Sequence, residues 1–279
     1  MTGGGPGRPP APAPAPLPAT AFDSHCHLDM IDGPVTDVLA RAAAAGITRV
    51  ITVGCDLESS HWSVKTAAEH DDVRAAVAIH PNETAAAASS LAGRDSVLAE
   101  IAALAGRPEV RAIGETGLDY YRDSAPPAVQ REWFAAHIDI AKRAGKALMI
   151  HDRDAHDDVL DILAAEGAPE HVVFHCYSGD ADMARRCADA GYVLSFAGTV
   201  TFSSAAQLRE AAAVVPAGLL LAETDAPFLT PVPSRGKSNE PAQVAHTIRA
   251  LAAVRQQDVA ELCAAIEATG ERVFGPWPA

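Results

Sequence analysis

The chain has 279 residues, of which 48% are hydrophobic, and this is enough to bury one full core. Its formal net charge of -14 argues against a protein that holds nucleic acid through a broad basic surface, because that mode of binding needs clustered Lys and Arg. No run approaches the roughly 18 apolar residues that a membrane-spanning helix requires, so we expect no membrane association.

The N-terminal segment, residues 1–20, consists mostly of Gly, Pro and Ala and is expected to be disordered, because it has little apolar surface to bury. It holds one basic residue, Arg8, and no continuous apolar run, which argues against a signal peptide. The five cysteines are scattered, odd in number and without Cys-x-x-Cys spacing, as expected for reduced thiols. We therefore expect a cytoplasmic protein with one domain over residues 21–279, and a monomer is the favoured oligomeric state.

Short apolar strands alternate with helical segments along the rest of the chain. The expected strands span residues 21–28, 47–54, 73–80, 110–115, 147–151, 172–175, 192–197 and 219–224. The expected helices span residues 34–45, 59–70, 90–105, 127–144, 157–166, 181–190 and 205–213, and a helical region closes the chain from residue 241. Glycines such as Gly46 and Gly145 follow these helices, as is typical of helix ends.

Eight strand–helix units of this kind predict an α/β fold, the (β/α)8 or TIM barrel, in which each strand is buried on both faces. An open doubly wound sheet is the alternative fold. No Gly-x-Gly-x-x-Gly or Walker-type loop follows the first strand, so the nucleotide-cofactor version of that alternative lacks its signature.

Polar side chains recur where the predicted strands end. They are His25, His27, His80, Glu115, His151, His175 and Asp225. The carboxyl ends of barrel strands meet at one face, where active sites are found, so these residues are expected to converge. His25 and His27 alternate on one strand, so both imidazoles can face one ion. For any single one of these histidines, a hydrogen-bonded structural role is the competing interpretation; the set as a whole favours a metal site.

Glu115 is the central residue of this prediction. A carboxylate has two oxygens and can bind two metal ions at once, so Glu115 is a candidate bridge of a two-metal centre. The competing interpretation is a solvated loop residue after a strand.

Five ordered motifs resemble the TatD family of metal-dependent deoxyribonucleases over residues 21 to about 275. They are Phe22-Asp23-Ser24-His25-Cys26-His27-Leu28-Asp29, Gly114-Glu115-Thr116-Gly117-Leu118-Asp119-Tyr120-Tyr121, Ile150-His151-Asp152-Arg153-Asp154-Ala155, His175-Cys176-Tyr177-Ser178-Gly179 and Glu223-Thr224-Asp225-Ala226-Pro227. One departure is Ala147, where the family often has Pro. The resemblance implies a TIM barrel of the metallo-dependent hydrolase superfamily.

The resemblance also implies two metal ions. His25, His27, Glu115 and Asp225 would bind one ion, and Glu115, His151 and His175 would bind the other. Imidazole-rich sites suit Zn, Mn, Fe, Co or Ni better than Mg, whereas family nucleases are often assayed with Mg, so the sequence leaves the metal open.

The expected reaction is two-metal hydrolysis of DNA phosphodiesters, as a 3'-5' exodeoxyribonuclease acting on single strands or 3' ends, with Asp225 and Glu115 as the catalytic residues. His80, Arg153 and Arg235 are candidates for binding the substrate phosphate. An ester or amide hydrolase using the same site, such as a D-aminoacyl-tRNA deacylase, is one alternative. A non-catalytic metal-binding scaffold is the other.

Overall fold

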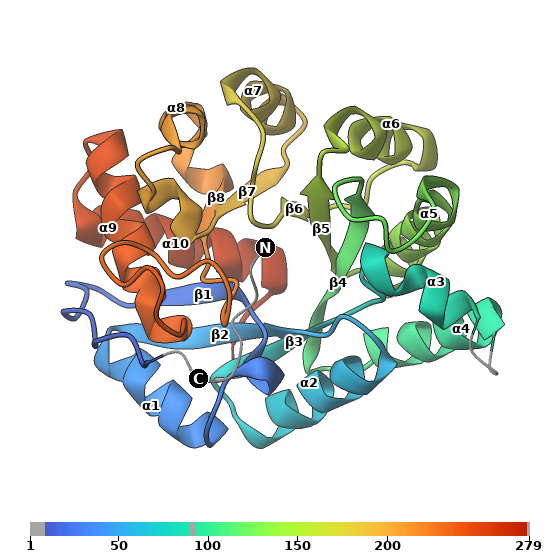
Figure 1. Ribbon diagram of the computed structural model, residues 1–279, viewed down its shortest axis with the longest axis horizontal. Coiled ribbons are helices and arrows are strands. Elements are labelled where there is room, and N and C mark those ends of the chain that lie inside the picture. Colours follow the sequence, from blue (N-terminus) through green and yellow to red (C-terminus); the bar gives the residue numbers. More distant parts are fainter. Residues whose placement is uncertain (1–8, 90–92, 278–279) are drawn as a thin grey trace. The chain divides into compact units, whose positions relative to one another are not determined.

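The structure is a computed structural model that describes residues 9–89 and 93–277. The eight strands follow one another in the sheet in chain order, β1 to β8, and the pairs from β3 to β6 and from β7 to β8 are parallel. Helices separate successive strands (Figure 1). This is the (β/α)8 barrel that the sequence predicted. Within the described residues, none of the helices has the length and apolar character needed to cross a bilayer.

The chain divides into two compact units. Unit 1 comprises residues 1–51 and 176–272, and unit 2 comprises residues 52–175 and 273–279.

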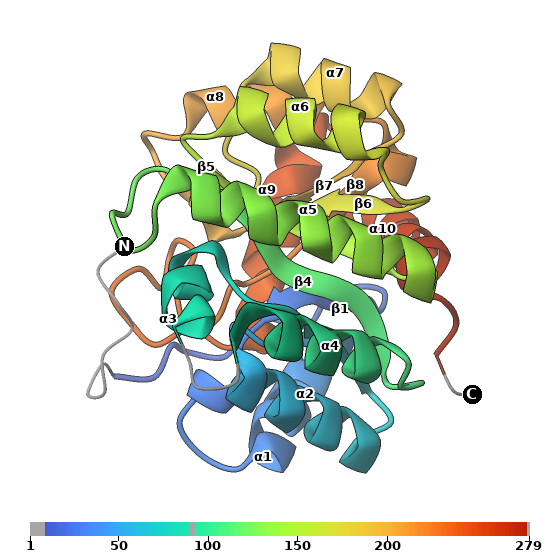
Figure 2. The same ribbon diagram turned by 90° about the vertical axis from the view of Figure 1, so that its right-hand side faces the viewer.

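Unit 2 contains the middle of the chain and five of its helices. Its strands are the end of β2 (Ile47–Val53), β3 (Val73–Val77), β4 (Val110–Asp119), β5 (Ala147–Arg153) and β6 (Val172–Phe174). Its helices are α2 (Leu57–Glu69), α3 (Thr84–Ala88), α4 (Gly93–Ala105), α5 (Pro127–Ala144) and α6 (His156–Glu166). Helices α4 and α5 lie side by side on the outside of the strands (Figure 2). Helix α3 was not predicted, and residues 90–92 of the predicted helix 90–105 lie outside the described residues.

Helix α5 has the boundaries that its sequence predicted. Pro127 occupies the first turn, where a missing N–H costs nothing. Gly145 ends the helix in the left-handed conformation, with φ of 61°, and the Lys146 N–H donates to the Ala141 carbonyl at 3.0 Å. Trp133 and Phe134 are buried, so the helix is held on the sheet by its aromatic side.

Strand β4 extends four residues beyond its predicted end, because residues 116–119 pair with residues 150–153 of β5. The register shifts between Ile113 and Thr116, so that Gly114 and Glu115 together oppose Met149. Such a bulge shifts the alternation of side chains by one residue and places Glu115 on the face that carries Met149 and His151. Glu115 therefore lies within β4, not at its end.

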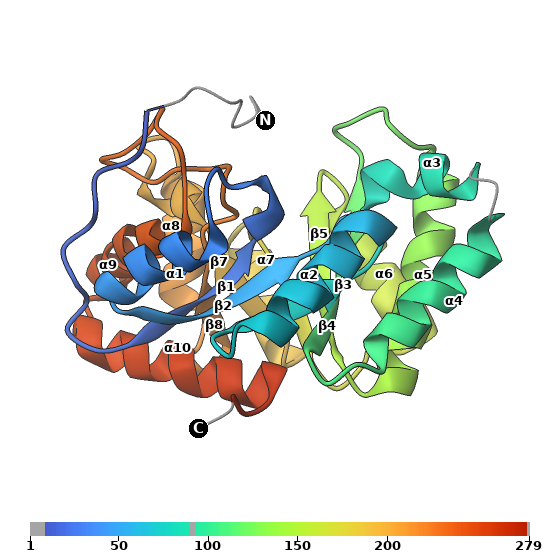
Figure 3. The same cartoon turned by 90° about the horizontal axis from the view of Figure 1, so that it is seen from below.

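Unit 1 contains both ends of the sheet order. Its strands are β1 (Ala21–Cys26), the first part of β2, β7 (Val193–Phe196) and β8 (Leu220–Ala222). Its helices are α1 (Val35–Ala44), α7 (Ala181–Asp189), α8 (Ala206–Val214), α9 (Val244–Arg255) and α10 (Val259–Phe274), of which residues 259–272 belong to this unit. Arg49 of β2 forms ion pairs with Glu267 and Glu271 at 2.8 and 2.9 Å, and these hold α10 beside β2 (Figure 3). The predicted closing helical region is thus two helices, separated at Gln256, which has φ of 52°.

The end of the N-terminal segment runs along unit 1. Arg249 donates to the carbonyls of Ala15 and Pro16 at 2.6 and 2.9 Å, and Gln243 donates to that of Pro12 at 3.0 Å. Leu17 is buried. Residues 1–8 of the segment expected to be disordered lie outside the described residues. Residues 12–17, in contrast, are ordered by these contacts, because Arg and Gln side chains donate hydrogen bonds to their backbone carbonyls.

Gly117 is the position in β4 that tolerates a side chain least. Its φ is 138°, and a Cβ there would overlap the His151 carbonyl of β5. We expect Gly117→Ala to lower the free energy of unfolding by roughly 2–5 kcal/mol, combining backbone strain with overpacking. Gly145→Ala is the matched control, because Gly145 also has positive φ but has nothing within 4 Å of a built Cβ. It should cost about 1–2 kcal/mol. Urea unfolding measures both, and equal losses would contradict the steric argument.

Candidate metal centre

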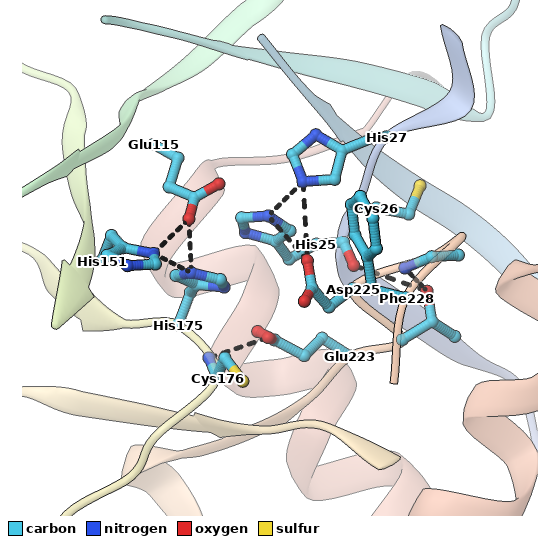
Figure 4. Close-up of polar contacts among 12 residues, drawn as sticks. His25, Cys26, His27, Glu115, His151, His175, Cys176, Glu223, Asp225 and Phe228 are labelled. Atoms are coloured by element: carbon cyan, nitrogen blue, oxygen red, sulfur yellow. Dashed lines mark hydrogen bonds and ion pairs between the residues drawn. The ribbon is translucent and has the colours of Figure 1, made fainter. Parts of the chain in front are cut away.

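In unit 1, two histidines and one aspartate form a buried cluster, which we call the His–Asp group (His25, His27 and Asp225). The two Nε2 atoms lie 3.3 Å apart. The Asp225 Oδ1 lies 3.5 Å from the His27 Nε2 and 3.8 Å from the His25 Nε2 (Figure 4). All three side chains are buried, so their polar atoms face one another and not bulk solvent.

The backbone of β1 and of the segment after β8 fixes this group. The Asp225 N–H donates to the His25 carbonyl at 2.9 Å, and the His27 N–H donates to the Ala226 carbonyl at 2.8 Å. Two residues before His25 in β1, the Asp23 carboxylate accepts hydrogen bonds from the backbone N–H and the hydroxyl of Thr224. Burial raises the pKa of Asp23. These hydrogen bonds join β1 to the segment after β8, about 200 residues later in the sequence, and so fix the backbone around His25 and Asp225.

In unit 2, three imidazoles surround a single carboxylate oxygen, and we call this cluster the Glu115 group (His80, Glu115, His151 and His175). The Glu115 Oε1 lies 2.6 Å from the His151 Nδ1, 2.8 Å from the His175 Nε2 and 3.4 Å from the His80 Nε2 (Figure 4 draws the first two contacts). Burial alone would raise the pKa of Glu115, but the three imidazoles outweigh it and hold that pKa well below its usual range. Glu115 is therefore ionised, as a metal ligand must be.

Asp119, at the end of β4, orients His151. Its Oδ2 lies 3.3 Å from the His151 Nε2, and it also accepts from the Asn82 side chain at 3.1 Å. Burial would lower the pKa of His151, but the hydrogen bonds with Asp119 and Glu115 raise it. Both ring nitrogens thus face carboxylates; if an ion took the place of the Nδ1 proton, the hydrogen bond to Asp119 would keep the other proton on Nε2 and leave the Nδ1 lone pair for the ion. A carboxylate behind a ligating histidine is a common feature of metal sites.

His80 differs from His151 in the ring nitrogen that it turns toward Glu115, which is Nε2. Its Nδ1 accepts the backbone N–H of Asn82 at 3.0 Å, so the neutral ring carries its proton on Nε2, toward Glu115. Burial lowers the pKa of His80, which favours the neutral ring. His80 is thus arranged as a hydrogen-bond donor and not as a metal ligand.

A buried histidine on α5 braces two of these positions. The His137 Nε2 accepts the Ile79 N–H at 3.3 Å, and its Nδ1 lies 2.8 Å from the Thr116 hydroxyl. Burial lowers its pKa to about 3, so the ring is neutral. Ile79 precedes His80 and Thr116 follows Glu115, so this one ring connects the backbones that carry both.

The distances between the ligand atoms are close to those that one bound ion requires. Two ligands held at about 2.1 Å by a tetrahedral ion lie about 3.4 Å apart. The 3.3, 3.5 and 3.8 Å separations in the His–Asp group match this spacing. In the Glu115 group, the two shorter contacts are hydrogen bonds that would widen by less than about 1 Å around an ion. Imidazole and carboxylate donors of this kind fit a divalent transition metal.

The three predicted phosphate-binding residues lie in different settings. His80 belongs to the Glu115 group. Arg153 lies at the end of β5, two residues beyond His151, with its guanidinium 3.8 Å from the ring centroid of Tyr121. Arg235 is an exposed residue of unit 1 whose guanidinium lies over Phe202 at 4.2 Å, and none of its contacts within the described residues involves the His–Asp group.

Asp119, Asn82 and His137 were not predicted to support the site. Asp119 carried a usable signal, because residues 115, 117 and 119 alternate along one strand and share a face. Asn82 lies between β3 and β4 and acts through both its backbone N–H and its side chain, and His137 comes from a helix, so neither has a sequence pattern that indicates its role.

Comparison with known proteins agrees with this chemistry. A protein-family model described as "TatD related DNase" matches residues 22–275. The chain is 47% identical to an "uncharacterized metal-dependent hydrolase TatD" of Mycobacterium tuberculosis, over 91% of this chain and 97% of that protein. It is 37% identical to the "uncharacterized metal-dependent hydrolase YabD" of Bacillus subtilis, over 91% and 98%.

A solved structure gives the same result for the fold. The crystal structure of YJJV, a TatD homologue from Escherichia coli K12, superposes with a TM-score of 0.84 at 28% identity, covering 92% of this chain and 98% of that one. The resemblance of the five motifs is thereby confirmed over nearly the whole sequence, and the chain belongs to the TatD family of metal-dependent hydrolases.

Proposed function

We propose that this protein hydrolyses phosphodiester bonds of DNA, as a 3'-5' exodeoxyribonuclease with two divalent ions. The observation that carries the proposal is the pair of ligand sets: the His–Asp group with ligand-like spacing, and the Glu115 group with one carboxylate oxygen facing three imidazoles. The family description as a DNase supports DNA as the substrate.

In this proposal His25, His27 and Asp225 would hold one ion, His151 and His175 would hold the other, and Glu115 would be shared by the two. The imidazoles face the Oε1 of Glu115, and its Oε2 lies 4.0 Å from the Cys55 thiol. The carboxyl ends of strands converge in a (β/α)8 barrel, and this general rule is our reason for assigning the two groups to one centre. Bound divalent ions supply Lewis acidity, which makes water a stronger acid and withdraws charge from phosphoryl oxygens.

The protein residues have separate roles in the reaction. Asp225 orients the attacking water and accepts its proton on a carboxylate oxygen, as the water oxygen bonds to phosphorus and the bond to the sugar oxygen breaks; the leaving oxygen then takes up this proton to become a hydroxyl. The Nε2–H of His80 donates to a phosphoryl oxygen as its charge rises. Asp119 holds the proton of His151 on Nε2, so that Nδ1 keeps its lone pair.

Purified protein, with and without chelator, should be offered single-stranded DNA, RNA, a D-aminoacyl-tRNA and simple amides. We expect chelator-sensitive cleavage of DNA from the 3' end. Faster release of the amino acid from the D-aminoacyl-tRNA would favour the deacylase alternative, and metal binding without turnover of any substrate would favour the scaffold.

Glu115→Gln tests the bridge. We expect this variant to lose at least one ion and nearly all turnover, because a neutral amide offers one good ligand oxygen in place of two. Elemental analysis and rate measurement check it. Glu100→Gln, on the half-exposed side of α4, is the control and should keep both ions. A full complement of metal in the Glu115→Gln protein would rule out bridging.

Asp225→Asn tests the proton acceptor. The amide keeps the size of the side chain but accepts a proton poorly, so we expect an unchanged unfolding midpoint and a kcat lower by about 10²- to 10⁴-fold. Asp182→Asn, on the exposed surface of α7, should leave both quantities unchanged. An unaltered kcat for Asp225→Asn would remove this carboxylate from the mechanism.

A further inference from the structure

Tyr121 is an exposed aromatic side chain beside the Glu115 group. Three large apolar or aromatic side chains are exposed within the described residues, and Tyr121, at 63%, is the one that is aromatic. The guanidinium of Arg153 lies over its ring, 3.8 Å from the centroid. This cation–π contact covers one face of the ring. Much of the remaining ring surface is exposed to solvent, so a second flat group has room to stack on it.

Asp119 ties this ring to the candidate metal centre. Its Oδ1 accepts the backbone N–H groups of Tyr121 and Arg122 at 3.1 and 2.9 Å, while its Oδ2 faces the Nε2 of His151. The Tyr120 N–H in turn donates to the Arg153 carbonyl at 2.9 Å. Tyr121 is therefore placed by the same carboxylate that orients a proposed metal ligand.

The spacing suits a strand of nucleic acid. Arg153 follows His151 by two residues on β5, about 7 Å along the strand. A phosphate at the Glu115 group would thus have the nucleotide next to it within reach of the Tyr121 ring.

The charge around this pair favours stacking over electrostatic capture. Asp152, Asp154 and Asp157 lie on the same segment as Arg153, and the whole chain carries a net charge of -14. Asp158 is neutralised by Arg131 and bonded to the Tyr120 hydroxyl at 2.6 Å. Stacking on an aromatic ring tolerates such surroundings, because it depends on the faces of the bases and not on phosphate charge.

Arg153 offers one more group to a ligand. Its Nη1 is buried and has no hydrogen-bond partner among the described residues. A buried N–H group without an acceptor lowers the stability of the folded protein. An oxygen of a base or a phosphate could accept a hydrogen bond from it.

We propose that Tyr121 and Arg153 form a stacking platform for the base next to the cleaved phosphodiester, and that these two residues select an unpaired end over a paired one. A base within a duplex has both faces covered by its neighbours, so the platform accepts it only after the end has opened. This inference rests on the proposed function and names the residues that would determine its preference for unpaired ends.

Binding to metal-loaded protein tests the platform without turnover when the terminal linkage of the strand is a non-hydrolysable phosphonate. The probe is a short single strand with 2-aminopurine at its 3' end, whose fluorescence reports stacking. We expect Tyr121→Phe to bind as the wild type does, and Tyr121→Leu to raise Kd by about 5- to 150-fold, because leucine keeps bulk but offers no aromatic face. Arg153→Ala should raise Kd by about 2- to 5-fold. An equal Kd for Tyr121→Leu and wild type, or no binding by wild type, would overturn the platform.

A second probe replaces the terminal base by an abasic residue. Wild type should bind it more weakly than the intact strand, by the same factor that Tyr121→Leu costs, whereas the Tyr121→Leu protein should bind both equally. The platform is wrong if wild type does not distinguish the two strands.

Turnover by metal-loaded protein separates the two proposals. If DNA is cleaved and KM is the same for wild type and Tyr121→Leu, the nuclease proposal stands and the platform fails. If the binding differences appear but DNA is not cleaved, the platform stands and the nuclease proposal fails.

Discussion

The contact on which the Glu115 group depends is that between one buried carboxylate oxygen and three imidazoles. An ionised carboxylate in a protein interior is unstable without partners, and the imidazoles of His80, His151 and His175 supply them. The bulge in β4 makes this possible, because it shifts Glu115 onto the face of the sheet that carries His151. Backbone geometry and electrostatics are thus linked at the same residue, and His137 fixes the backbone on both sides of the contact.

The pKa values of buried carboxylates in this protein shift in opposite directions because their neighbours differ. Asp23 accepts hydrogen bonds from neutral groups, and burial raises its pKa. Glu115 and Asp119 are also buried, yet imidazoles and backbone N–H groups lower their pKa values. Hydrogen bonds from neutral groups make Asp23 a structural link between strands, whereas the lowered pKa values of Glu115 and Asp119 suit metal binding and the orientation of a ligand. Environment, and not residue type, separates these roles.

The sequence predicted the barrel and the order of its strands, because hydrophobic periodicity and helix-ending glycines are local signals. It missed what depends on pairing between segments. The extension of β4 to Asp119 follows from its register with β5, and the bulge at Glu115 is visible only in that register. The tautomer of His80 depends on one backbone N–H of Asn82. Such features involve hydrogen bonds between particular atoms, and alternation of apolar residues carries no information about them.

The strongly negative charge of the chain appears at first to conflict with an anionic polymer as substrate. A broad basic surface would bind any nucleic acid along its length, and with it every duplex in the cell. A site that relies on ions held by imidazoles and carboxylates attracts a phosphate only where the ions lie, and an exposed aromatic ring such as Tyr121 adds affinity only for a base that is already unpaired. The surrounding acidic residues then oppose binding elsewhere on the surface. Net negative charge is therefore compatible with a nuclease that acts at ends, and it contributes to selecting them.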